Sequence, residues 1–187
     1  MEFRGSTVES MGMNPKFWNR KRVFLTGHTG FKGSWLSIWL QNLGADLVGY
    51  ALNPPTQPNL FEIAHVASRM DSIIGDIRDF SNLKTTLTRA QPELVFHMAA
   101  QPLVRHSFLH PIETYQTNVM GTVHLLEAIR NTPSVKSAVV VTSDKCYHNT
   151  DSAKPFDEDH RLGGLDPYSN SKSCAEFATA AYRTSFF

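Results

Sequence analysis

Cysteine is scarce in this sequence, and long apolar runs are absent. Cys146 and Cys174 are the only 2 cysteines among 187 residues. They lie far apart and form no C-x-x-C motif, so nothing indicates a disulfide framework. Reduced, packed thiols fit a reducing compartment, and we expect a cytoplasmic protein. No run of about 18 apolar residues occurs, so the sequence predicts no membrane-spanning helix and no membrane partner.

An excess of charge of either sign is lacking too. The sequence has 18 lysines and arginines against 17 aspartates and glutamates, and no segment concentrates the basic residues. The electrostatic signature of nucleic-acid binding is therefore missing. We expect a small molecule as the partner.

The N-terminus lacks the apolar core of a secretory signal. Charged residues stand at Glu2, Arg4 and Glu9, so we expect residues 1–14 to form a loose tail. The apolar content and length of the rest suffice for one sizeable core, which predicts a single domain over residues 15–187.

Glycine, by contrast, is concentrated at one place. Gly27, Gly30 and Gly33 follow a β-branched and aromatic run at 23–26, and apolar residues then recur at helical spacing over 35–43. In such a strand, turn and helix, glycines allow a tight turn, close approach of a pyrophosphate and close packing of the helix on the strand. The free amides of an amphipathic helix would then face the phosphates. The predicted phosphate-binding residues are Gly27, Thr29, Gly30, Phe31, Lys32 and Gly33.

Strand and helix patterns alternate along the rest of the chain. Further strands are predicted at 45–50, 72–75, 93–98 and 137–142, and helices at 60–67, 81–90, 112–130 and from Asp166 onward. This alternation predicts an α/β fold with a right-handed, doubly wound parallel sheet, a Rossmann-like domain. No segment remains for a substrate domain. We therefore expect the N-terminal part of a longer enzyme, truncated before its last strands.

The carboxyl ends of these parallel strands are the expected ligand crevice. Asn53 stands near the position where an acidic residue often binds the adenosine ribose, and no arginine follows directly to hold a 2′-phosphate, which favours NAD over NADP. Asp79 stands where either a helix N-cap or a ligand contact is expected, and the sequence leaves both roles open. The other predicted cofactor contacts are Asp76, Ile77, Ala99, Ala100, Gln101, Asn118, Thr142, Tyr168 and Lys172.

Tyr168 and Lys172 form the strongest candidate for a catalytic pair. They are four residues apart at the start of a predicted helix and so share one of its faces. A lysine ammonium beside a phenol favours the phenolate, which can act as a base toward a sugar or alcohol hydroxyl. Amphipathic helices also place such pairs on solvated faces. Their position downstream of the glycine turn and of Ser143 favours the catalytic interpretation.

These residues resemble a known superfamily over about 20–182. The G-x-x-G-x-x-G spacing with Ser143, Tyr168 and Lys172 is similar to the extended short-chain dehydrogenase/reductases. Within that superfamily, three stretches resemble the CDP-glucose branch of the nucleotide-sugar 4,6-dehydratases, where Lys145 replaces the glutamate of the other branches. They are Thr-Gly-His-Thr-Gly-Phe-Lys-Gly-Ser-Trp-Leu at 26–36, Gly-Tyr-Ala-Leu at 49–52 with Pro54-Pro55, and Thr-Ser-Asp-Lys at 142–145.

The resemblance implies a lyase reaction in deoxysugar biosynthesis, such as that of lipopolysaccharide O-antigens. CDP-glucose would be dehydrated to CDP-4-keto-6-deoxyglucose by internal redox: Tyr168 deprotonates the 4-hydroxyl, NAD takes the C4 hydride, water leaves across C5 and C6, and the hydride returns to C6. Ser143 would bond the substrate oxygen, and Asp144 would be the acid. We hypothesise that Lys145 is the base at C5, which requires burial near Lys172. The alternative is that Lys145 only pairs with Asp144 or stabilises the enolate. The resemblance also implies a homodimer formed by the 112–130 and Tyr168 helices.

Other functions fit parts of the same pattern. A dTDP-glucose or GDP-mannose 4,6-dehydratase would share the fold and the triad. A nucleotide-sugar 4-epimerase would use Tyr168 and Lys172 but would not need Asp144 and Lys145. A non-catalytic NAD-binding module would need only the glycines.

A metal site is not predicted. His106 and His110 are spaced as neighbours on a helix, but Pro111 interrupts it and no third ligand is apparent from the sequence.

Overall fold

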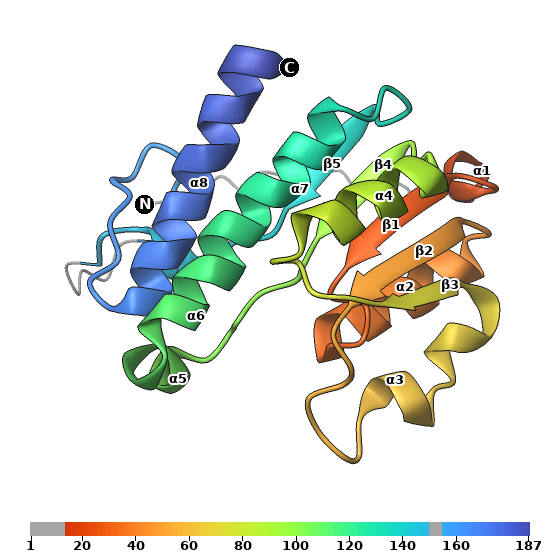
Figure 1. Ribbon diagram of the computed structural model, residues 1–187, viewed down its shortest axis with the longest axis horizontal. Coiled ribbons are helices and arrows are strands. Elements are labelled where there is room, and N and C mark those ends of the chain that lie inside the picture. The colour runs from red at the N-terminus through yellow and green to blue at the C-terminus, as the bar shows by residue number, and fades with distance from the viewer. Residues whose placement is uncertain (1–13, 150–154) are drawn as a thin grey trace, which may run out of the picture.

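The computed structural model describes residues 14–149 and 155–187, so most of the predicted tail at 1–14 lies outside the described residues. A five-stranded, all-parallel sheet in the order β3-β2-β1-β4-β5 organises the chain (Figure 1). This confirms the doubly wound α/β prediction. The strands are β1 (Arg22–Thr26), β2 (Asp46–Ala51), β3 (Asp71–Ile74), β4 (Leu94–His97) and β5 (Ser137–Val140).

Helices and short helical turns connect the strands. They are α1 (Pro15–Trp18), α2 (Phe31–Asn42), α3 (Leu60–Ile63), η1 (Val66–Arg69), α4 (Phe80–Ala90), α5 (Val104–Leu109), α6 (Pro111–Tyr115), η2 (Gln116–Met120), α7 (Gly121–Arg130), η3 (Asp144–Cys146) and α8 (Pro167–Phe186). In the part of the chain that is described, none of these helices combines the length and apolarity needed to cross a membrane.

Alternate residues of the central strands feed two separate cores. Phe24 and Val95 point into the core shared with α4 and α7. Val23 packs on the opposite face with Leu40 of α2 and Leu47 of β2. Because the strands are buried on both faces, they read as nearly continuous apolar runs in the sequence.

The orientation of α2 differs from the amphipathic prediction. Trp35 and Trp39 are 54% and 51% exposed, whereas the buried positions include Gly33, Ser34 and Ser37. A Cβ built on Gly33 would lie 2.0 Å from the Gly27 carbonyl oxygen, so the helix starts too close to β1 for large side chains. The helix therefore packs through small residues at its start and through Leu40 further along, and its tryptophan face is exposed.

Two other predicted helices are interrupted in the structure. The helix expected over 60–67 is two short turns, separated by His65 in a left-handed conformation with φ of 48°. The helix predicted over 112–130 runs from Pro111 to Arg130 with one wide turn at its centre. A Cβ on Gly121 would lie 2.8 Å from Ile77 Cγ2, so this glycine allows the helix to pack closely against the segment after β3.

Candidate active site

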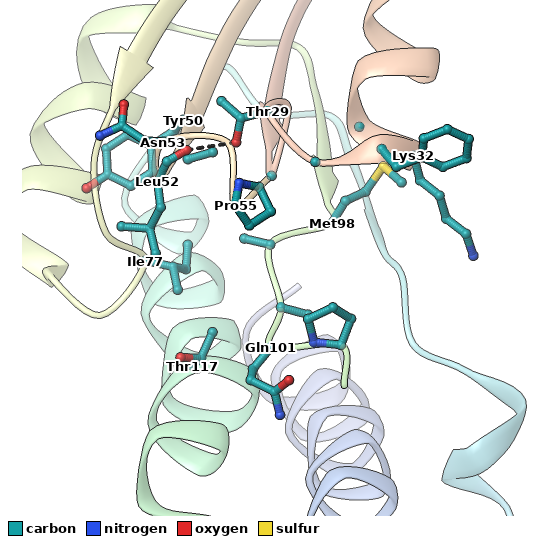
Figure 2. Close-up of a pocket in the computed structure, with 18 of the residues that line it drawn as sticks. Thr29, Lys32, Tyr50, Leu52, Asn53, Pro55, Ile77, Met98, Gln101 and Thr117 are labelled. Atoms are coloured by element: carbon teal, nitrogen blue, oxygen red, sulfur yellow. Dashed lines mark hydrogen bonds between the residues drawn. The ribbon is translucent and has the colours of Figure 1, made fainter. Parts of the chain in front are cut away.

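A cavity of about 730 Å³ opens at the carboxyl ends of the central strands (Figure 2). Nearly all the predicted cofactor contacts line it, although they come from six separate segments of the sequence. The predicted residues that line it are Gly27, Thr29, Gly30, Phe31, Lys32, Gly33, Asn53, Asp76, Ile77, Ala99, Ala100, Gln101, Thr142, Tyr168 and Lys172.

The glycine turn forms one wall of this cavity. Gly27 has φ of +80°, and a Cβ there would lie 2.8 Å from the Ala99 backbone nitrogen. The turn closes through a bond from the Gly30 amide to the Gly27 carbonyl (3.1 Å), and α2 begins at once with Phe31. Backbone amides at a helix start thus face the cavity, as an anionic phosphate requires.

Two side chains anchor the turn to its neighbours. The His28 ring is fully buried, its Nε2 lies 2.7 Å from Ser72 Oγ, and burial lowers the pKa of His28 to about 4. The Thr29 hydroxyl donates to the Leu52 carbonyl (2.7 Å), the dashed line in Figure 2. The sequence analysis did not predict this role of His28. The one related feature in the sequence is Gly49, which leaves room for the His28 ring, because a Cβ on Gly49 would lie 2.4 Å from it.

An ion pair occupies the edge of the cavity beyond β3. The Arg78 guanidinium donates to both carboxylate oxygens of Asp76, and these bonds hold the pKa of Asp76 below its usual range. The Tyr50 hydroxyl donates to the Asp76 carbonyl (3.1 Å). Arg78, which the sequence analysis did not single out, also lines the cavity. Asp79 is the N-cap of α4 and accepts from the Asn82 amide (3.1 Å), which is one of the two roles that the sequence left open.

A buried histidine orders the end of β4. Thr26 Oγ1 accepts the amides of Met98 and Ala99 (both 3.1 Å), so its own proton must go to Nδ1 of His97 (2.7 Å). Thr122 Oγ1 donates to a backbone carbonyl and therefore accepts from His97 Nε2 (3.1 Å). Burial, reinforced by the charge of Lys172, lowers the pKa of His97 to about 3. A neutral ring thus fixes the strand end that carries Ala99.

Asn118 lies behind the cavity wall rather than on it. Its Oδ1 accepts the Gln101 amide (2.8 Å), and its Nδ2 donates to the Gln101 carbonyl (3.1 Å) and to Ser171 Oγ (2.9 Å). The side chain is buried. Asn118 therefore ties the loop after β4 to α8, and it supports Gln101 instead of lining the cavity.

The start of α8 brings Tyr168 and Lys172 to the cavity. Asp166 caps the helix by accepting the Ser169 amide (3.0 Å), and the Tyr168 amide donates to Ser107 Oγ (3.1 Å). Lys172 Nζ lies 3.5 Å from the Val141 carbonyl. Burial lowers the pKa of Lys172 to about 8, so its ammonium is mostly charged at neutral pH.

Ser143, Asp144 and Lys145 are not among the residues that line the large cavity. Asp144 and Lys145 line a separate cavity of about 170 Å³. Ser143 Oγ donates to Asp144 Oδ1 (3.0 Å) and accepts the Lys145 amide (3.2 Å). Lys145 is exposed, so the prediction that Lys145 is buried near Lys172 is wrong. Lys172 is the buried lysine of the pair.

The family follows from sequence comparison. A sequence model of the GDP-mannose 4,6 dehydratase family matches residues 24–186. The chain belongs to this family. The membership confirms the sequence-based resemblance to nucleotide-sugar dehydratases, and it covers every segment that lines the large cavity.

Individual relatives share the sequence to different degrees. The CDP-glucose 4,6-dehydratase of Salmonella typhimurium is 57% identical over 175 residues, which are 94% of this chain and 49% of that protein. A GDP-mannose 4,6-dehydratase of Vibrio cholerae is 30% identical, with 90% of this chain and 47% of that protein covered. The structure of Brucella ovis UDP-glucose 4-epimerase with NAD has a TM-score of 0.77 at 29% identity, with 89% and 49% covered. The chain spans about half the length of the curated relatives it matches.

Proposed function

We propose that the protein containing this chain is a lyase that dehydrates CDP-glucose to CDP-4-keto-6-deoxyglucose. The 57% identity to the Salmonella CDP-glucose 4,6-dehydratase carries this proposal, because the identity to a GDP-mannose 4,6-dehydratase is only 30%. Lys145, the residue that resembles the CDP-glucose branch, supports the same choice. Since the chain spans about half of that relative, the activity is proposed for the whole protein.

We propose NAD as its cofactor and residues 15–187 as the NAD-binding domain. The large cavity has the glycine turn and helix start that a pyrophosphate needs, and Gly33 leaves no room for a Cβ. Arg78 is the one arginine among the described residues that line it, and Asp76 already binds that guanidinium. This pairing favours NAD over a cofactor with a 2′-phosphate. Bound NAD would accept a hydride from the sugar and return it within one turnover.

The proposed proton transfers are assigned to different residues of this chain. We propose that the Tyr168 phenolate oxygen accepts the proton of the sugar 4-hydroxyl, and that Lys172, one helical turn further along α8, supports it in this role. The α8 helix holds both side chains at one wall of the cavity. Asp144 is our candidate for the acid at the C6 hydroxyl and Lys145 for the base at C5. Because Lys145 is exposed in this structure, the alternative role is to pair with Asp144 or to stabilise the enolate. Both follow Ser143, whose hydroxyl would bond the sugar oxygen.

Competing substrates test this proposal. Purified full-length protein should convert CDP-glucose to a 4-keto-6-deoxy sugar faster than it converts dTDP-glucose or GDP-mannose, and Tyr168→Phe should lower the rate of that conversion by about 10²–10⁴. Faster conversion of either competitor would assign the protein to another dehydratase branch. A 4-epimer formed without loss of water would make it an epimerase, and NAD binding without turnover would indicate a non-catalytic module.

We further propose a cytoplasmic homodimer. Figure 1 shows α6, α7 and α8 side by side, and these helices expose large apolar side chains, with Ile112 73% and Phe177 58% exposed. Such surfaces are typical of helices that pair with a second copy. Cys146 and Cys174 are free thiols, which fits a reducing compartment. Sedimentation that finds only monomer at micromolar concentration would contradict the dimer.

A further inference from the structure

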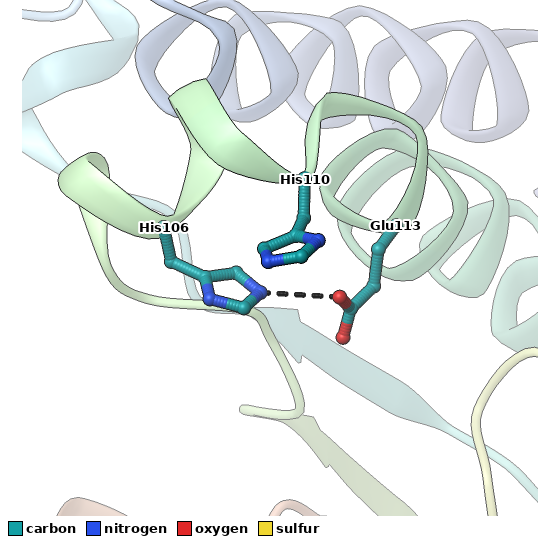
Figure 3. A group of neighbouring side chains, drawn as sticks. All are labelled: His106, His110 and Glu113. Carbon is teal, nitrogen blue, oxygen red and sulfur yellow. Dashed lines mark hydrogen bonds and ion pairs between the residues drawn. The ribbon is translucent and has the colours of Figure 1, made fainter.

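Three side chains at the junction of α5 and α6 converge on one point (Figure 3), and one of them, Glu113, also lines the large cavity. His106 Nε2 lies 3.1 Å from Glu113 Oε2, and the His106 and His110 rings stack with centroids 4.4 Å apart. One ligand atom from each of the three residues lies within 4.8 Å of the others. Glu113 is the third ligand that the sequence analysis missed, because it lies beyond Pro111 on a separate helix.

The backbone that carries these side chains is already fixed. The His110 amide donates to the His106 carbonyl (2.8 Å), and the His110 carbonyl accepts the Thr114 amide (3.1 Å). Thr114 Oγ1 donates to the same carbonyl (3.0 Å) and accepts from Gln101 Nε2 (3.0 Å). Pro111 further restricts the conformation of His110. The three ligands therefore sit on short, tied helices, and no loop has to be ordered to bring them together.

The donor set selects one class of ion. Two imidazoles and one carboxylate suit zinc, nickel, cobalt or copper, whereas magnesium and calcium prefer oxygen ligands alone. Tetrahedral zinc with bonds of about 2.0–2.1 Å separates its ligand atoms by roughly 3.3 Å. The 3.1 Å pair of His106 and Glu113 is close to that spacing. The His110 side chain is exposed and can rotate to close the set.

We infer that His106, His110 and Glu113 bind one divalent transition-metal ion of the zinc class, with water in the remaining coordination position. The competing explanation is a plain ion pair between His106 and Glu113. Arg78 also acts electrostatically on Glu113, but its guanidinium is bonded to Asp76. The Glu113 carboxylate is therefore available to an ion.

Zinc titration of full-length protein, after chelator treatment, tests the inference. In competition with a chromogenic chelator, the protein should bind zinc saturably at the site. His106→Gln and His110→Gln should each weaken that binding by about 100-fold or more, since even loss of an outer-shell partner typically costs 10–100-fold. Glu113→Gln should also weaken it. His65→Asn is the matched control, because His65 is an exposed histidine away from the cluster and asparagine tolerates its φ of 48°.

Cobalt provides a second readout. Bound at this site, it should give the intense visible absorption of a tetrahedral nitrogen and oxygen complex, and His110→Gln should lose that absorption while its circular dichroism stays native. Added magnesium should displace neither metal. The inference is overturned if the wild-type protein binds no zinc, or if His106→Gln and His110→Gln bind it as tightly as wild type. Either result would leave His106 and Glu113 as an ion pair.

Discussion

The two ends of the proposed site differ in how firmly they are held. At the cofactor end, the segment 27–33 is tied to β2 and β3 through buried His28 and through Thr29. At the other end, Ser143 and Asp144 bond mainly to each other, and Lys145 is exposed. The cofactor end is thus built by contacts within this chain. At the acid and base end the backbone is held through Cys146, whose carbonyl accepts from Ser173 Oγ and from the Gly163 amide, but Asp144 and Lys145 themselves are exposed.

Tyr168 and Lys172 belong structurally with the firmer end. Both are buried and line the large cavity, whereas Asp144 and Lys145 line the small one. The residues proposed for catalysis are therefore divided between two cavities. This division predicts different consequences for substitutions on its two sides.

The largest expected effect is the loss of turnover when a catalytic residue is replaced at either end of the proposed site. In full-length protein, Tyr168→Phe should lower the rate of CDP-glucose conversion by about 10²–10⁴, and Lys145→Met should do the same if it removes the base. The two variants should differ in where the reaction stops. Lys145→Met should still reduce bound NAD with substrate, but it should not exchange the C5 proton with deuterated solvent. Tyr168→Phe should neither reduce bound NAD nor exchange the C5 proton. Wild-type C5 exchange in Lys145→Met would show that Lys145 is not the base.

The next effect separates two glycines of the same turn. Gly33→Ala should lower the free energy of unfolding by about 3 kcal/mol, because the new Cβ would lie 2.0 Å from a backbone carbonyl oxygen. Gly30→Ala is the matched control, since its Cβ would lie at an ordinary 3.4 Å. Urea unfolding of both variants measures the difference. Equal stabilities would mean that α2 does not pack on the turn as described.

A smaller effect, of opposite sign, is expected at Lys172. Its pKa is lowered by burial to about 8, so the folded state is destabilised by holding this charge at neutral pH. Lys172→Met should therefore raise the free energy of unfolding by roughly 1–3 kcal/mol at pH 7 while abolishing turnover. Lys145→Met, at an exposed position, should change stability by less than about 0.5 kcal/mol. A destabilised Lys172→Met would contradict the burial argument.

The smallest effect is the pH dependence of stability. Burial lowers the pKa of His97 to about 3 and that of His28 to about 4, below the ordinary value of about 6.5. Between about pH 4 and 6.5 the unfolded chain binds more protons, so stability should fall as the pH falls through this window, by about 1 kcal/mol for each histidine between pH 6.5 and 5.5. Denaturant titrations at several pH values measure it. A His28→Asn variant with an unchanged pH slope would show that His28 does not contribute.

The sequence predicted local features better than long-range contacts. The strands, the glycine turn and the start of the last helix at Asp166 follow from residue patterns within short windows, and all appear in the structure. The exposed face of α2 was missed because it depends on Gly27 and Gly33 meeting in space.

The site shows the same limit. The residues at the strand ends were predicted to line the large cavity, because the carboxyl ends of parallel strands meet at one edge of the sheet. Arg78 and His97 were missed because their roles depend on partners at Asp76, Thr26 and Thr122, and no residue pattern marks such partners. The expected burial of Lys145 failed because distance along the chain does not specify which of two lysines is covered.

Calorimetric titration of NAD into this 187-residue chain tests the central claim most directly, because the claim is that the cofactor end is formed by the chain's own contacts. We predict saturable binding of one NAD per chain, and loss of that binding in Gly33→Ala. CDP-glucose titrated alone under the same conditions should bind far more weakly. A chain with native circular dichroism that binds no NAD, or that binds CDP-glucose more tightly than NAD, would contradict the account.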